Sequence, residues 1–230
     1  MRPRLAAAQG RCPGGPAIHK REERGVVIPV EGEERVLEGV LISGVDDDAV
    51  GAVVAAPHPA YGGSMDSPVV HEVAYAARTA GLASLRFNWR GVGGSGGVAS
   101  SEFADADADY CAALTQLGET VSGVMVAAGY SFGALAAVRS AASEPRVRAL
   151  LLVAPPAAML DVAALSAFPG RITVLVGDAD AIASAAELER IVDALPRASI
   201  DVVDDADHFF AVGLAEVGRL AAKCFARFGS

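Results

Sequence analysis

The chain has 230 residues, of which 52% are hydrophobic and 20% are charged, so it is long enough for one domain with a sizeable buried core. Its formal net charge of −9 at pH 7 argues against a nucleic-acid partner, because an acidic surface repels phosphate groups. No apolar run approaches the roughly 20 residues that a membrane-spanning helix needs, which argues against a membrane protein.

The first 25 residues differ in charge from the rest of the chain. They hold six Lys or Arg against two Glu, a local balance of +4 that leaves −13 for the remainder. Their apolar segment is too short for a secretory signal, and their Pro, Gly and Arg content favours a disordered extension. Three cysteines at unrelated spacings, Cys12, Cys111 and Cys224, argue against a disulfide framework and favour a reducing cytoplasm.

Beyond this extension, apolar strands and Ala-rich helices follow one another. Strands are expected at 26–30, 35–43, 50–56, 82–87, 121–128, 147–154, 171–177 and 199–204. Helices are expected at 67–80, 101–117, 132–143, 183–195 and 209–228, with a loop or short helix between 154 and 171. Continuous apolar strands followed by helices predict an α/β fold with a mostly parallel sheet covered on both faces. The opening strands lack intervening helices, so we expect that edge to be antiparallel and residues 26–230 to form one domain.

The stretch RGVGGSGG, residues 90–97, matches two glycine motifs, and the sequence argues against both functions. As G-x-G-x-x-G from Gly91, it would place a diphosphate at the start of the next helix, where several carboxylates would repel it. Those carboxylates are Glu102, Asp105, Asp107 and Asp109. As G-x-S-x-G around Ser95, it is followed by more loop, whereas a nucleophilic serine needs a helix directly after it.

A second G-x-S-x-G at residues 129–133 has the setting that the first lacks. An apolar strand leads into Gly129, and a strongly helical segment begins at Ala134. Small residues two positions before and after the serine allow the strand and the helix to approach closely. Ser131 is therefore the candidate nucleophile, strained and exposed at the carboxyl edge of the sheet. The alternative is an ordinary Gly-rich turn.

A nucleophilic serine needs a general base, and the base needs an orienting acid. In hydrolases with a strand–turn–helix serine, the acid and then the histidine follow it along the chain, and His208 is the only histidine after Ser131. An isolated histidine can also be a surface or core residue. Asp180, at the end of the strand 171–177, is favoured as the acid over Asp178, which is expected to stabilise the turn. The other nearby acids, Asp204, Asp205 and Asp207, are expected to form a solvated turn.

The backbone supplies candidate donors for an oxyanion. The amide of Phe132 follows the nucleophile, and the loop after the third strand offers Ala60 as its first amide beyond Pro59, with Tyr61 next. The same loop region contains His58, with His71 and Asp66 nearby. Their spacing matches no known metal-ligand pattern, so we expect no metal and a histidine that packs within its loop.

Five ordered motifs then resemble one family. APHPAYGGSMDSPVV, LRFNWRGVGGSGG, GYSFGA, GDAD and DHFF are similar to those of small lidless bacterial α/β-hydrolases, which are dienelactone-hydrolase-like predicted carboxylesterases or acyl hydrolases. The resemblance runs from about residue 26 to the end. It implies an α/β-hydrolase fold without a cap domain, a triad of Ser131, Asp180 and His208, and a structural role for the loop 90–97.

Two departures from the family pattern leave this triad intact. Ala56 stands where the family's H-P-H-P loop has its first histidine, so any role of that histidine is missing. Trp89 replaces the second aromatic residue of R-F-N-F-R.

The expected chemistry is two-step acyl transfer on a small-molecule ester, without a metal or organic cofactor. Only about 16 residues separate the strands 147–154 and 171–177, too few for a lid, so we expect an open, shallow site that takes short or accessible acyl groups. Four residues are expected to border it, Tyr61, Met159, Leu160 and Phe209, although each could equally be core.

Other functions and assembly states remain open on sequence grounds. A thioesterase would use the same triad, and a non-catalytic hydrolase-fold binding protein would keep the same sheet. A dehalogenase would carry Asp in place of Ser131. Either a monomer or a homodimer is compatible with the sequence.

Overall fold

The computed structural model describes residues 23–44 and 50–228. The expected disordered extension lies outside the described residues as far as residue 22, and its last three residues belong to the first strand. The strands are β1 (Glu23–Pro29), β2 (Val36–Ile42), β3 (Gly51–Ala55), β4 (Ala83–Phe87), β5 (Met125–Tyr130), β6 (Val147–Val153), β7 (Arg171–Gly177) and β8 (Ala198–Val203). The α-helices are α1 (Pro68–Thr79), α2 (Phe103–Gly118), α3 (Phe132–Ser140), α4 (Val162–Ala167), α5 (Ala185–Asp193) and α6 (Leu214–Phe225).

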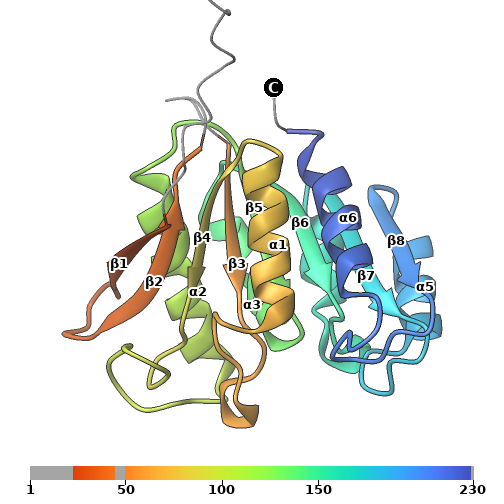
Figure 1. Ribbon diagram of the computed structural model, residues 1–230, viewed down its shortest axis with the longest axis horizontal. Helices are drawn as coiled ribbons and strands as arrows, with labels where there is room; N and C mark the ends of the chain where they lie inside the picture. Colours follow the sequence, from red (N-terminus) through yellow and green to blue (C-terminus); the bar gives the residue numbers. More distant parts are fainter. Residues whose placement is uncertain (1–22, 45–49, 229–230) are drawn as a thin grey trace, which may run out of the picture.

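The eight strands form one sheet in the order β1-β2-β4-β3-β5-β6-β7-β8. β1 pairs with β2, and β2 with β4, in antiparallel fashion, and every later pairing is parallel. The mostly parallel sheet with an antiparallel edge that the sequence predicts is therefore confirmed. Loops that follow the parallel strands gather at one edge, the lower one in Figure 1.

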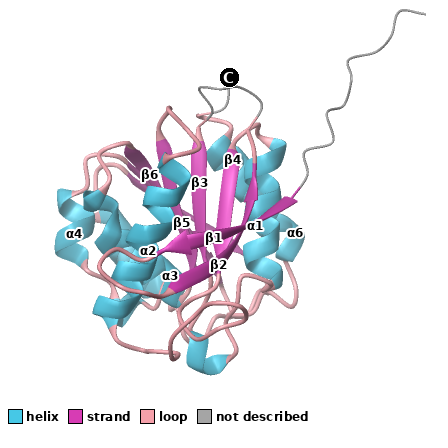
Figure 2. Ribbon diagram, turned by 90° about the vertical axis from the view of Figure 1, so that its left-hand side faces the viewer, coloured by secondary structure: helices cyan, strands magenta, loops and turns pink. Residues whose placement is uncertain are grey.

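Helices cover both faces of this sheet. α1 and α6 lie side by side in front of it in Figure 1, with α2 and α3 behind, and Figure 2 shows α4 on the same side as α2 and α3. Every residue of β3, β4 and β5 is buried, as expected for strands covered on both faces. Between β6 and β7 the chain forms only a 3-10 turn, η3 (Ala157–Met159), and the short α4, so no cap domain is present there.

Most element boundaries lie within three residues of the sequence prediction, and two differ by more, for identifiable reasons. β5 begins at Met125 rather than at 121, because the Val121 amide still donates to Leu117 O at the end of α2. α6 begins at Leu214 rather than at 209. The intervening residues form turns, with left-handed backbone at Phe210 (φ 52°) and Gly213 (φ 88°).

None of the helices within residues 23–44 and 50–228 is long and apolar enough to cross a bilayer.

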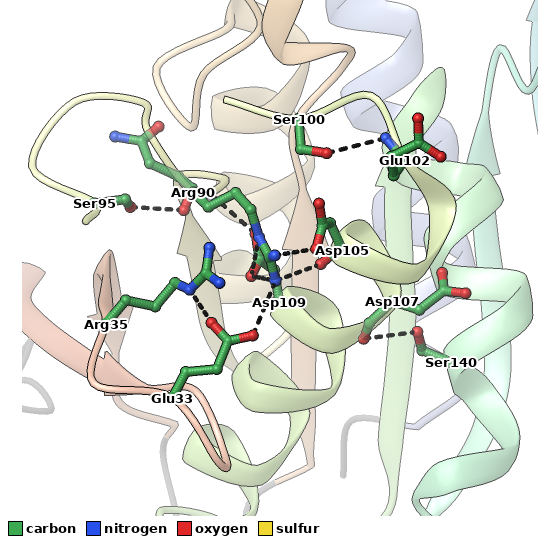
Figure 3. A network of polar contacts seen from close by, with 11 residues as sticks. Glu33, Arg35, Arg90, Ser95, Ser100, Glu102, Asp105, Asp107, Asp109 and Ser140 are labelled. Carbon is green, nitrogen blue, oxygen red and sulfur yellow. Dashed lines mark hydrogen bonds and ion pairs between the residues drawn. The ribbon is translucent and has the colours of Figure 1, made fainter. Parts of the chain in front are cut away.

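A buried ion pair fastens the loop that follows β4 to α2 (Figure 3). The Arg90 guanidinium donates from Nη2 to Asp109 Oδ1 at 2.8 Å and from Nε to the same carboxylate. The backbone amide of Arg90 also donates to Asp109 Oδ2 at 2.9 Å, and Asp105 pairs with Nη1. Since both Arg90 and Asp109 are buried, neither charge has water to replace its partner.

We predict that Asp109→Ala lowers the free energy of unfolding by about 3–5 kcal/mol, because it leaves a buried cation without its main partner. Chemical denaturation measures this loss. Glu216→Ala removes an exposed ion pair with Arg219 and is the control, because exposed pairs contribute little. Equal stability of the two variants would contradict the account of Arg90 as a buried, paired charge.

Candidate active site

Ser131 lies in a sharp turn between β5 and α3. Its backbone is in the left-handed region, with φ 55° and ψ −115°, a conformation that a residue with a side chain adopts only under strain. Its amide donates to Val153 O at 2.8 Å, and its carbonyl accepts from Ala134 N at 3.0 Å. These bonds hold the turn, and the hydroxyl reaches the lining of a pocket.

Two glycines make this turn possible. A Cβ atom on Gly129 would lie 2.2 Å from Gly133 C and O, and one on Gly133 would lie 2.6 Å from the carbonyl oxygens of Ala55 and Ala56. Real Cβ atoms essentially never come closer than 3.0 Å to such atoms. The close approach of strand and helix that the small residues predict is confirmed, and α3 also begins against the end of β3.

His208 and Asp180 complete a hydrogen-bonded chain with Ser131. Ser131 Oγ lies 3.0 Å from His208 Nε2, and His208 Nδ1 lies 2.8 Å from Asp180 Oδ2. The other carboxylate oxygen, Asp180 Oδ1, accepts from the amides of Ile182 and Ala183 at 2.8 and 2.7 Å. All three side chains are buried, so water competes little for these bonds. Ser131 and His208 are 77 positions apart in sequence, and Asp180 and His208 are 28 apart. The three residues thus meet at the carboxyl edge of the sheet.

The remaining acids near His208 lie elsewhere. Asp178 is exposed, whereas Asp180 is buried, which separates the two alternatives that the sequence leaves open. Asp204 and Asp205 are also exposed. Asp207 Oδ1 accepts from Phe209 N and Ala211 N, both at 3.1 Å, so it stabilises the turn that carries His208.

Tyr130 holds the backbone of His208 through a hydrogen bond. Its hydroxyl donates to His208 O at 2.7 Å, and the two rings lie 5.6 Å apart. Burial raises the pKa of the Tyr130 phenol, and the charges of Asp180 and Asp207 raise it further, so the hydroxyl keeps its proton. Sequence reasoning did not identify this residue, because a tyrosine at the variable position of G-x-S-x-G carries no signal for a contact 78 positions away.

The first glycine loop is fixed by the protein's own groups. Ser95 Oγ donates to Asn88 O at 2.8 Å and accepts from Glu38 N at 2.9 Å. The Glu38 carboxylate accepts from Gly94 N at 2.8 Å and from Asn88 Nδ2 at 2.7 Å. The Gly94 amide, which a bound phosphate would need as a donor, is therefore already bonded to a fixed carboxylate. Ser95 has a structural role in this loop. The contacts of the loop support neither a dinucleotide site nor a nucleophilic role for Ser95.

A pocket of about 710 Å³ contains Ser131 and His208 in its wall. Of the four residues expected to border it, Tyr61, Met159 and Phe209 line the pocket. Leu160 does not, because it turns inward and packs against the core. The volume lies within the range of pockets that enclose drug-sized ligands, so it offers more room than the shallow site expected from the sequence.

One of the expected oxyanion donors, in the loop after β3, is wrong. The Ala60 amide already donates to His58 Nδ1 at 3.1 Å, and Ala60 does not line the pocket. His58 itself lines the pocket, and its amide has no acceptor among the described residues. Phe132, as the first residue of α3, has an amide with no acceptor inside the helix. The candidate oxyanion donors are thus Phe132 N, as predicted, and His58 N in place of Ala60 N.

Trp89 secures this loop. Its indole Nε1 donates to the carbonyl oxygens of Ala56 and Pro57, both at 3.1 Å, and its ring packs edge-on against Phe132 at 5.6 Å. The tryptophan that departs from the family pattern therefore bonds the loop directly after β3, where His58 lies.

The three residues weighed as metal ligands do not converge. His71 Nε2 lies 3.4 Å from Asp66 Oδ1, and both side chains are largely exposed, while His58 Nδ1 accepts from Ala60 N. Within the part of the chain that the structure describes, no three His, Cys, Asp or Glu side chains gather as a metal site.

We predict that Gly133→Ala lowers the free energy of unfolding by about 1–3 kcal/mol, because the added methyl group overlaps two carbonyl oxygens at the end of β3. Gly25→Ala is the matched control. A Cβ atom at Gly25 meets nothing within 4 Å, so this variant should be as stable as the parent chain. Denaturant titration measures both, and an unchanged Gly133→Ala variant would contradict the packing described here.

Known bacterial proteins are similar to this chain over most of its length. No protein-family model matches the chain. An uncharacterized protein of Rickettsia prowazekii (strain Madrid E) is 30% identical over 199 residues, which cover 82% of this chain and 83% of that protein. The structure is similar to that of an alpha-beta serine hydrolase homologue from Coxiella burnetii, with 28% identity, a TM-score of 0.77, and coverage of 88% of this chain and 96% of that one.

A third relative bears on the absence of a cap. It is a Xanthomonas campestris protein described as an a/b serine hydrolase without lid, with 27% identity, a TM-score of 0.73, and coverage of 90% of this chain and 94% of that one. The chain therefore belongs to the family of small bacterial α/β-hydrolases.

Proposed function

We propose that this protein hydrolyses carboxylic esters through an acyl-enzyme formed on Ser131. The observation that carries the proposal is the continuous chain Ser131 Oγ–His208 Nε2–His208 Nδ1–Asp180 Oδ2, with distances of 3.0 and 2.8 Å at its two hydrogen bonds. This is the arrangement in which a histidine removes the serine proton while a buried carboxylate fixes the ring tautomer.

In the first step, Ser131 Oγ attacks the ester carbonyl carbon while its proton passes to His208 Nε2. The resulting imidazolium is stabilised by Asp180, whose position is fixed by two backbone amides. The bond to the alcohol oxygen then breaks, and His208 returns the proton to the departing alcohol. A water molecule attacks the acyl-enzyme by the same route, which releases the acid and restores Ser131.

The developing oxyanion would be stabilised by Phe132 N and His58 N. The two amides belong to residues that line the same pocket as Ser131, and the amide of Phe132 lies at the positive end of α3. Preorganised backbone donors of this kind contribute a large share of the rate enhancement in acyl transfer.

The pocket wall favours an uncharged, apolar ester. No Lys, Arg, Asp or Glu lines this pocket, so nothing in its wall pairs with a charged substrate group. Its mouth is bordered by exposed apolar side chains, with Tyr61 88% and Phe209 68% exposed, which suits accessible acyl or alcohol groups. A coenzyme A thioester would bring several phosphate charges to a wall without a cation, which supports esters over such thioesters.

We predict that Ser131→Ala lowers kcat/KM on 4-nitrophenyl butyrate by at least roughly 10³-fold, because the nucleophile is lost. Ser95→Ala should keep kcat/KM within a few-fold of the parent and lose stability instead, since it removes one buried and one partly buried hydrogen bond. Release of 4-nitrophenol measures the rates, and full activity of Ser131→Ala would refute the proposal.

The parent enzyme should also act faster on the butyrate ester than on butyryl-coenzyme A, and the reverse preference would favour a thioesterase.

We predict that Tyr130→Phe lowers kcat by roughly 3–10-fold with little change in KM, because the lost hydroxyl no longer anchors the backbone of His208. The phenylalanine ring preserves the packing against His208 and Phe210. Steady-state kinetics on the same ester separate kcat from KM, and the melting temperature controls for general destabilisation. An unchanged kcat would show that the hydrogen bond to His208 O does not position the base.

A further inference from the structure

His58 presents a fixed hydrogen-bond donor to the active-site pocket that the acyl-transfer steps do not use. The residue lies in the wall of the pocket that contains Ser131 and His208. Its ring centroid is 4.6 Å from that of Phe132 and 5.0 Å from that of Tyr61. These two contacts hold the imidazole plane beside the residue that follows the nucleophile.

The tautomer of this ring follows from its one hydrogen bond. The Ala60 amide donates to His58 Nδ1 at 3.1 Å, and a backbone N–H can only donate, so Nδ1 carries a lone pair. In a neutral imidazole the proton then lies on Nε2. Burial lowers the pKa of His58, which favours the same neutral form.

The Nε2–H group has no hydrogen-bond partner within residues 23–44 and 50–228. No acceptor for it exists among the residues that the structure describes, although the ring is partly buried. Two other polar side chains of the wall are engaged, because Ser131 bonds to His208 and the Tyr130 hydroxyl bonds to His208 O. Ser67 and Tyr61 also contribute hydroxyl groups to the wall. His58 is thus an unpartnered ring N–H donor in a wall whose remaining residues are mostly apolar or small.

We propose that His58 Nε2–H donates a hydrogen bond to an acceptor oxygen of the substrate outside the reacting ester group. This inference rests on the proposed esterase function and narrows its substrate class to uncharged apolar esters that carry a further ether, keto or hydroxyl oxygen. A neutral donor selects such an oxygen without attracting carboxylates or phosphates, in agreement with the absence of charged residues in the wall. His58 therefore determines specificity, and the triad performs the chemistry.

Two substitutions separate the donor from the loop contact. In His58→Asn the side-chain oxygen takes the place of Nδ1 and can still accept from the Ala60 amide, since asparagine is a favoured capping residue, but the donor at the Nε2 position is lost. In His58→Gln the longer amide carries an N–H group to about the position of Nε2. The Asn variant removes the proposed contact, and the Gln variant is the matched rescue.

The test uses pairs of 4-nitrophenyl and alkyl esters in which one methylene is replaced with an ether oxygen, at successive positions of the acyl or alcohol chain. The kcat/KM ratio of the ether ester to its hydrocarbon partner is compared between variants, which cancels intrinsic differences in reactivity. For at least one pair, we expect the ratio to fall roughly 3–10-fold in His58→Asn and to recover at least in part in His58→Gln. Unchanged ratios in His58→Asn for every pair would overturn the inference.

A binding measurement keeps this test independent of catalysis. In Ser131→Ala, calorimetric titration with the unhydrolysed esters should show tighter binding of the ether ester in at least one pair, and His58→Asn on that background should abolish the difference. If the parent enzyme hydrolyses none of the esters, the proposed function fails while the titration still decides the role of His58. Equal affinities within every pair would reject that role even if hydrolysis is fast.

Discussion

The left-handed backbone of Ser131 is the constraint on which the rest of the site depends. A residue with a side chain is held in that conformation only where its surroundings leave no alternative. Here Ser131 is held by the hydrogen bond from its amide to Val153 O and by the close contact between Gly129 and Gly133. This contact lets α3 begin directly against β3 and β5. The strain places a hydroxyl at the carboxyl edge of the sheet, beside the positive end of a helix. Any change that relaxes the turn moves the hydroxyl away from His208.

The other parts of the site arrive as loops from neighbouring strands, and each is anchored by buried polar contacts. Asp180 follows β7 and is fixed by two amides, and His208 follows β8 and is fixed by Tyr130 on β5. Trp89, just after β4, bonds the loop that follows β3. Because these anchors come from the sheet itself, the site needs no cap domain to hold its geometry. The same lack of a cap leaves apolar side chains exposed at the pocket mouth.

The sequence predicts those features that depend on local pattern. Continuous apolar strands and Ala-rich helices gave the mostly parallel sheet, and the strand–turn–helix setting distinguished Ser131 from Ser95. The order of Ser131, Asp180 and His208 along the chain also predicted that these three would meet, but the other long-range contacts of the site were beyond such reasoning. Nothing in the local pattern shows that the Ala60 amide bonds to His58 Nδ1, that Leu160 packs inward, or that Tyr130 reaches His208 O. The sequence also predicts the start of α6 too early. The turn before it is built from Asp207 side-chain hydrogen bonds and left-handed residues, and neither feature interrupts the hydrophobic pattern of the sequence.

In the proposed mechanism Ser131 forms a covalent bond with the acyl group. The most direct measurement is to treat the protein with a fluorophosphonate, digest it and locate the added mass by peptide mass spectrometry. We expect one adduct, on the peptide that contains Ser131, and loss of labelling when His208 is replaced by alanine. An adduct on Ser95, or continued ester hydrolysis by a protein whose Ser131 is fully blocked, would contradict it.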